Sequence, residues 1–90
     1  MAHFMISYDL HNGRNYQPLW NQLQHWGAVR LLESLWIVSL TGTAIQVRDV
    51  LNTVTDSDDS VAVIEVKTGS MWATRNCKAP GVEWLKKNIG

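Results

Sequence analysis

The chain has 90 residues, which is room for one domain, because chains add a domain for every ~100 to 200 residues. Its hydrophobic content of 46%, with five Trp, is high for a fold that buries only ~60 to 65% of its unfolded surface, so we expect an oligomer to cover part of it. Eight basic and eight acidic residues give zero net charge, which excludes nucleic-acid binding driven by overall positive charge.

The first 40 residues predict a strand, a helix and two further strands. In residues 3–10, even-numbered positions are apolar, which is typical of a strand with one buried face. A turn at 11–14 precedes a helix with Asn15 as N-cap and Gly27 just past its end. Residues 28–40 are too long for one ordinary strand, so we expect two strands that meet near residues 33–35. The helix buries a stripe at helical spacing, formed by Tyr16, Leu19, Trp20, Leu23 and Trp26.

The next 26 residues predict a second helix and a strand. Thr41, Gly42 and Thr43 form a loop and cap. The acidic turn at 56–59 ends this second helical region, and residues 60–66 return to a strand that is apolar on both faces, so we expect both of its faces to be covered. The second helix has one apolar face, formed by Ala44, Val47, Val50, Leu51 and Val54.

This order of elements predicts the α+β class and a ferredoxin-like βαββαβ fold, in which both helices cover one face of an antiparallel sheet. An antiparallel sheet with one solvated face alternates apolar and polar side chains, whereas several strands here are apolar on both sides. We therefore expect a second copy of the chain to cover the other face in a homodimer.

The last 24 residues differ in charge from the rest. Residues 1–66 hold three Arg and seven Asp or Glu, a net charge of −4, and residues 67–90 hold five Lys or Arg and one Glu, a net charge of +4. Pro80 marks the start of a short terminal helix, and Met71 to Ala73 suit a short edge strand. We interpret the chain as a single domain, 1–90, with a core at 1–66 and a basic C-terminal extension at 67–90.

Asp9 is the first candidate for chemistry. It ends the first strand on the face opposite the helices, where a twofold partner brings a second Asp9 close. Two such carboxylates suit Mg²⁺, or Mn²⁺, which takes oxygen ligands and activates a water for phosphodiester hydrolysis. The alternative is that Asp9 merely starts a turn. We expect the acidic turn at 56–59 to lie far from it.

Two residues of the turn that follows Asp9 are candidates to assist the hydrolysis or to bind the substrate. His11 is a possible general base, because imidazole exchanges protons near neutral pH, or else a solvated loop residue. Arg14 is a candidate to bind nucleic acid. We expect Trp20 and Trp36 in the core rather than as stacking platforms for bases, because stacking requires exposure.

The remaining candidates are ligands for nucleic-acid phosphates. Arg30 suits phosphate because guanidinium binds it through two hydrogen bonds, but it can equally pair with Glu33. Ser34 either contacts substrate or satisfies a backbone group. Lys86 and Lys87 either bind phosphate or form a solvated helix end.

Three segments carry a resemblance to a known family. Residues 6–10 (Ile-Ser-Tyr-Asp-Leu) resemble the first-strand Tyr-Asp signature of the small CRISPR-associated adaptation nucleases. Residues 27–36 match that family's Gly-x-x-Arg-x-x-x-Ser-x-aromatic run at the same spacing, and residues 58–61 resemble the start of its last core strand. The resemblance extends to the related virulence-associated protein D toxins, which cleave RNA, and the basic tail departs from the family, so we expect a stand-alone member.

The resemblance implies a ferredoxin-like homodimer that holds Mg²⁺ between two Asp9 carboxylates and acts on a phosphodiester. We therefore expect a metal-dependent endonuclease, specific for RNA or DNA. The alternative is a catalytically inactive homodimer that binds nucleic acid or a protein.

The single Cys77 excludes an internal disulfide framework. No apolar run reaches ~18 residues, and no secretion signal is recognisable, so we expect a cytoplasmic protein that does not bind membranes.

Overall fold

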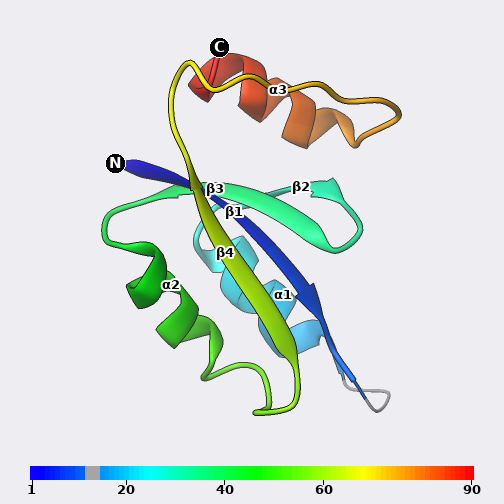
Figure 1. Ribbon diagram of the computed structural model, residues 1–90. Helices are drawn as coiled ribbons and strands as arrows, with labels where there is room; N and C mark the ends of the chain where they lie inside the picture. The colour runs from blue at the N-terminus through cyan, green and yellow to red at the C-terminus, as the bar shows by residue number, and fades with distance from the viewer. Residues whose placement is uncertain (12–14) are drawn as a thin grey trace.

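The computed structural model describes residues 1–11 and 15–90, in which an antiparallel sheet of four strands is combined with three helices (Figure 1). The strand order is β2-β3-β1-β4, which places the protein in the α+β class and leaves β2 and β4 at the edges. The predicted order of the first six elements along the chain is confirmed, as is the terminal helix. The elements are β1 (Ala2–Asp9), α1 (Gln17–His25), β2 (Val29–Leu32), β3 (Leu35–Leu40), α2 (Ala44–Leu51), β4 (Ser60–Val66) and α3 (Ala79–Asn88).

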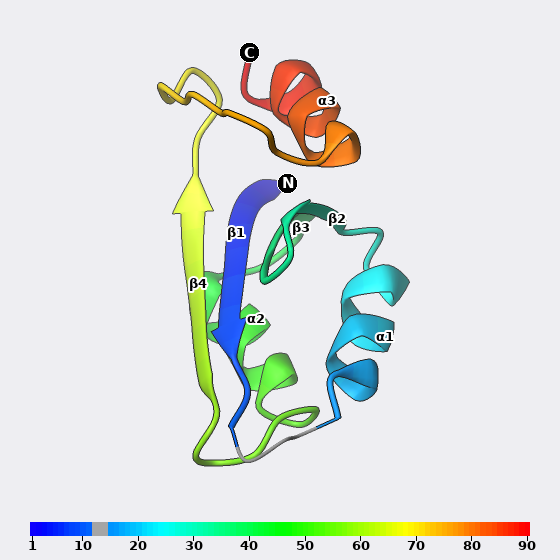
Figure 2. The ribbon, with the colours of Figure 1, turned by 90° about the vertical axis from the view of Figure 1, so that its right-hand side faces the viewer.

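Helices α1 and α2 lie on one face of the sheet and share its larger hydrophobic core (Figure 2). The even-numbered residues of β1 point into this core, as the alternation predicts. Each fully buried side chain of this size stabilises the fold by about 1.5 to 3 kcal/mol relative to exposure. The core includes Phe4, Ile6, Tyr8, Leu19, Leu23, Trp36, Val38, Val47 and Leu51.

The helix ends follow the predicted signals with one difference. Thr43 caps α2 in a reciprocal arrangement, since its side chain accepts from the backbone N–H of Gln46 and the Gln46 side chain accepts from Thr43. Gly27 adopts a φ of 76°, which only glycine does at little cost. Asn15 does accept from the N–H of Gln17, but the helix begins at Gln17 and the N-cap position is Tyr16.

Helix α3 packs on the opposite face of the sheet, where a second copy was expected. Its Leu85 and Ile89 form a second buried cluster with Leu31 of β2 and Ile37 of β3. Sequence pattern alone showed an apolar second face and an amphipathic terminal helix, but not that the one covers the other. Part of the surface that we attributed to a partner is thus buried within the same chain.

Close backbone contacts fix α3 against β2. The N–H of Lys78 donates to the carbonyl of Leu31 over 3.0 Å. Three residues later, a Cβ on Gly81 would lie 2.6 Å from the Cα of Leu31, a distance that real Cβ atoms do not tolerate. Glycine at this position lets the first turn of the helix lie directly on the strand.

The segment between β4 and α3 does not contain the strand predicted at Met71 to Ala73. In the described residues this segment is irregular, and Met71 is 99% exposed. It is tied instead to the end of α3, because the N–H of Gly69 donates to Ile89 over 2.8 Å and the indole of Trp72 donates to the carbonyl of Gly90. These backbone acceptors lie at the C-terminal end of a helix, where carbonyls lack partners inside the helix.

The second face of the sheet is covered only in part. Strand β1 runs away from α3 (Figures 1 and 2), and Trp84 of α3 contacts His3 near the strand's beginning, with ring centroids 5.3 Å apart. On β4, Ala62 is exposed and Ile64 is 53% exposed, so one chain alone does not cover both faces of this strand, and cover by a second copy stays a prediction. Val50 of α2 is also exposed, contrary to its predicted place on the apolar face.

Candidate functional site

Asp9 lies at the end of β1, on the partly open face of the sheet. The alternation of β1 places it on the same side as Met5 and Ser7, opposite α1 and α2, as predicted. It pairs in register with Ser60 of β4 and is exposed. A shallow hollow of about 170 Å³ lies at these paired strand ends and is lined by Ser7, Tyr8, Asp9, Ser60, Val61 and Ala62.

The acidic turn lies beside this strand end rather than far from it, which corrects our expectation. Asp59 directly precedes Ser60, the register partner of Asp9. The backbone N–H of His11 donates to Asp59 over 3.0 Å, so the chain just past β1 touches the turn. Antiparallel pairing of the first and last strands puts the end of one beside the start of the other, and this consequence of the predicted topology was available from the sequence.

The acidic turn has the donor chemistry of a site for a hard cation. One carboxylate oxygen from each of Asp56, Asp58 and Asp59 lies within 4.8 Å of the others. Carboxylate oxygens are the ligands that Mg²⁺ and Ca²⁺ prefer. Exposed acidic groups are also common without any metal, and the three side chains all take part in interactions within the protein.

The structure describes one of the two candidate residues that follow Asp9. His11 is exposed and lies near the acidic turn, and it is its backbone, rather than its imidazole, that bonds to Asp59. Its predicted role as a general base stays a prediction. Arg14 lies outside the described residues.

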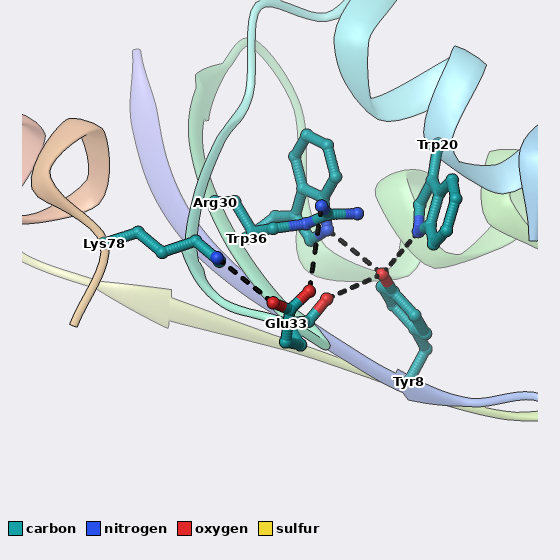
Figure 3. A network of polar contacts seen from close by, with 6 residues as sticks. All are labelled: Tyr8, Trp20, Arg30, Glu33, Trp36 and Lys78. Atoms are coloured by element: carbon teal, nitrogen blue, oxygen red, sulfur yellow. Dashed lines mark hydrogen bonds and ion pairs between the residues drawn. The ribbon is translucent and has the colours of Figure 1, made fainter. Parts of the chain in front are cut away.

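Tyr8, the neighbour of Asp9 in the Tyr-Asp pair, is the centre of a buried hydrogen-bond network (Figure 3). Its hydroxyl accepts from the indole N–H of Trp20 over 2.7 Å and from that of Trp36 over 3.1 Å, and it donates to the carbonyl of Glu33 over 3.3 Å. A hydroxyl has one hydrogen to donate and two lone pairs, so all are used. Tyr8 and Trp36 are each only 4% exposed, which confirms Trp36 as a core residue and gives Tyr8 a structural role.

Arg30 is held between two indole rings. Its guanidinium carbon lies 4.9 Å from the ring centroid of Trp20 and 4.6 Å from that of Trp36, within the range of cation–π attraction. It also lies 3.9 Å from a carboxylate oxygen of Glu33, so the pairing that we weighed against phosphate binding is present. Because Arg30 pairs in register with Trp36, it lies on the face opposite Asp9, and one subunit cannot direct both residues at the same phosphate.

The other predicted contacts are spread over the molecule. Ser34 lies in the turn between β2 and β3, and its carbonyl accepts from the N–H of Tyr8 over 3.3 Å. A contact between its hydroxyl and a substrate stays a prediction. Lys86 and Lys87 are exposed in the last turn of α3, with Lys86 3.6 Å from Glu83. Helix α3 lies at the end of the sheet away from Asp9 (Figure 1), so these lysines are not grouped with it.

Comparisons with known proteins do not assign the chain to a family. No family model matches it, and no solved structure is significantly similar to it. Among the residues that the structure describes, no helix has the length and apolar character needed to cross a lipid bilayer.

Proposed function

We propose that the protein is a metal-dependent endonuclease, a stand-alone relative of the small CRISPR-associated nucleases whose ferredoxin-like core is extended by α3. The observation that carries the proposal is the position of Asp9, exposed at the end of β1 on the part of the sheet that α3 leaves open. The sheet order and the two helices on one face agree with such a core. The Tyr-Asp pair is present with its tyrosine anchored in the core.

The residues at this end of the sheet fit the proposed metal, Mg²⁺ or Mn²⁺. In this proposal Asp9 supplies carboxylate oxygens. The three carboxylates of the acidic turn gather with one another rather than with Asp9, but they lie beside its register partner in the same subunit and add further oxygens there. When bound, such an ion supplies an activated water and neutralises charge on a phosphodiester. In this proposal His11, whose backbone bonds to the acidic turn, accepts the proton. Asp9 pairs with Ser60, which directly follows that turn.

The proposal includes a homodimer that forms on the open part of the sheet. Ile64 is 53% exposed on this surface, next to the exposed Ala62 and half-exposed Ser7. A second copy packed here by twofold symmetry buries these side chains and brings the two Asp9 residues toward each other. Ile64→Asp is expected to give a monomer, as measured by light scattering, while Ile45→Asp, on α2 and 63% exposed, leaves the dimer intact.

Cleavage of labelled RNA and DNA by the full chain, with Mg²⁺ and with EDTA, tests the proposed activity. Asp9→Asn removes the charge with little change of shape and is expected to lower the cleavage rate about 100-fold or more, because metal catalysis is worth several kcal/mol. The matched control is Asp49→Asn, an exposed aspartate on α2 that pairs with Arg48. If both variants cleave like the unmodified protein, the activity does not come from Asp9.

A second candidate function is a homodimer that binds nucleic acid without cleaving it. It is favoured by the separation of Lys86 and Lys87 from Asp9, since a nuclease is expected to hold its substrate near its metal. This candidate predicts salt-sensitive binding without turnover, weakened when Lys86 and Lys87 are replaced by Met. Binding that is insensitive to salt leaves only the version with a protein partner.

A further inference from the structure

Glu33 lies between two cations that come from different parts of the chain (Figure 3). One of its carboxylate oxygens is 3.1 Å from Nζ of Lys78, at the start of α3, and the other is 3.9 Å from Nη1 of Arg30, on β2. The side chain of Glu33 is 83% exposed, whereas that of Arg30 is 28% exposed and that of Lys78 is 42% exposed. Two partly buried cations thus face one carboxylate that is almost entirely in solvent.

The guanidinium of Arg30 is fixed before any ligand arrives. The rings of Trp20 and Trp36 lie on it, and Trp36 and Trp20 are themselves held by hydrogen bonds to Tyr8. The Nε atom of Arg30 is buried and has no hydrogen-bond partner among the described residues. A guanidinium that is already immobilised loses little conformational entropy when it binds an anion.

Lys78 is also placed by the fold. Its backbone N–H is bonded to Leu31, and the close approach of Gly81 to the same residue fixes the first turn of α3 on β2. That turn carries no acidic residue, so the positive end of the helix dipole adds to the two side-chain charges. The site therefore has a local excess of positive charge in a protein whose net charge is zero.

Glu33 is a weak occupant of this site. An ion pair with an exposed carboxylate contributes little to stability, because water competes for it and holding the side chain costs conformational entropy. The 3.9 Å contact with Arg30 is too long for a hydrogen bond. Rotation of the Glu33 side chain into solvent opens the space between the cations without disturbing the sheet.

We propose that Arg30 and Lys78 form a phosphate-binding site that Glu33 closes in the free protein. A phosphate group offers more charge and more acceptor oxygens than a carboxylate, so it can bind the guanidinium through two hydrogen bonds and still reach the ammonium of Lys78. The phosphate belongs either to a nucleic-acid backbone or to a free nucleotide, since the recognised chemistry is the same. Arg30 lies on the face opposite Asp9 and Lys78 at the start of α3, and the site needs no metal, so it does not rest on the proposed nuclease activity.

The test is a titration of the full chain with inorganic phosphate in the presence of EDTA, followed by NMR of the arginine Nε–H resonances. Phosphate is expected to shift the resonance of Arg30. Glu33→Gln removes the competing charge and is expected to raise the affinity about three- to fivefold, which corresponds to one exposed ion pair. Glu65→Gln is the control, because Glu65 also pairs with a lysine, Lys67, over 3.5 Å, and it is expected to leave the affinity unchanged.

A second pair of variants tests the cations. Lys78→Met is expected to lower the affinity about threefold or more. Lys67→Met, at an exposed lysine that pairs with Glu65, is expected to have no effect. Repeating the titration with a short single-stranded oligonucleotide and with a nucleoside monophosphate identifies the source, because the phosphate that belongs in the site gains more from Glu33→Gln. The proposal is overturned if Glu33→Gln and Glu65→Gln change the affinity equally, or if phosphate binds without shifting the Arg30 resonance.

Discussion

The two ends of the sheet carry opposite charge and are held together in different ways. At one end, the chain just past Asp9 is joined to the acidic turn by an exposed hydrogen bond from the N–H of His11 to Asp59, and another, from the N–H of Asp56 to Asp59, lies within the turn. At the other end, the basic segment ends in α3, which is fixed by the buried cluster around Leu85 and by backbone contacts to β2. The comparison shows that a neutral chain can separate an electronegative, lightly packed surface from an electropositive one that is part of the core. Substitutions at the two ends should therefore have unequal effects on stability.

The largest expected effect is at the basic end. Leu85 is 6% exposed in the cluster between α3 and the sheet, and Leu85→Ala leaves a cavity there. We expect it to lower the free energy of unfolding by about 2 to 5 kcal/mol. Urea denaturation followed by circular dichroism measures the change, and an effect below 1 kcal/mol would show that α3 is not a structural part of the fold.

Gly81→Ala should come next. Its new Cβ meets the backbone of β2, at Leu31 Cα and at the carbonyl oxygen of Arg30, so the helix must move away from the strand. We expect a loss of about 1 to 3 kcal/mol, although alanine is ordinarily the better helix former. A gain of stability in the same denaturation experiment would contradict the close packing of α3 on β2.

Tyr8→Phe tests the network that lies next to the acidic end. The substitution keeps the ring but removes the hydroxyl that accepts hydrogen bonds from the indole N–H groups of Trp20 and Trp36. The bond from Trp36 is buried. We expect it to cost about 1 to 2 kcal/mol, because a buried donor loses its partner. Since Arg30 stacks on the same indoles, its Nε–H resonance should shift as well, and unchanged stability would mean that the network contributes nothing.

The smallest effect is expected at the acidic end itself. Asp9 is exposed and ends a strand, so Asp9→Asn should change the free energy of unfolding by less than about 0.5 kcal/mol. Thermal unfolding compared with that of Asp49→Asn measures this. A large destabilisation would indicate that Asp9 serves the fold, and loss of activity in the variant would then say little about chemistry.

Local patterns predicted the elements well because they act over a few residues. The alternation of β1, the left-handed Gly27 and the capping by Thr43 each follow from neighbours in sequence. The strand expected at Met71 to Ala73 does not form, because a short apolar run becomes a strand only when it pairs with the edge of a sheet. Here the backbone of that segment bonds to the end of α3 instead.

What could not be predicted depends on contacts between distant residues. The spacing of Val82, Leu85 and Ile89 predicts an amphipathic helix, but the surface that it covers is decided by packing, with Gly81 as the only local sign of a close approach. The stacking of Arg30 between two indoles requires α1 and β3 to meet, and the site with Lys78 requires α3 to lie on β2. The position of the acidic turn is different, because the antiparallel pairing of β1 with β4 in the predicted fold is enough to place this turn beside Asp9.

Direct observation of metal binding at the Asp9 end tests the account most closely. Manganese added to ¹⁵N-labelled protein broadens the amide signals of residues near the bound ion. We expect the broadening to be strongest at Asp9, His11 and the acidic turn and to weaken with distance from them, to be reversed by excess Mg²⁺, and to be greatly reduced in Asp9→Asn but not in Asp49→Asn. Broadening that is absent, or that is the same in both variants, would contradict a metal site built on Asp9.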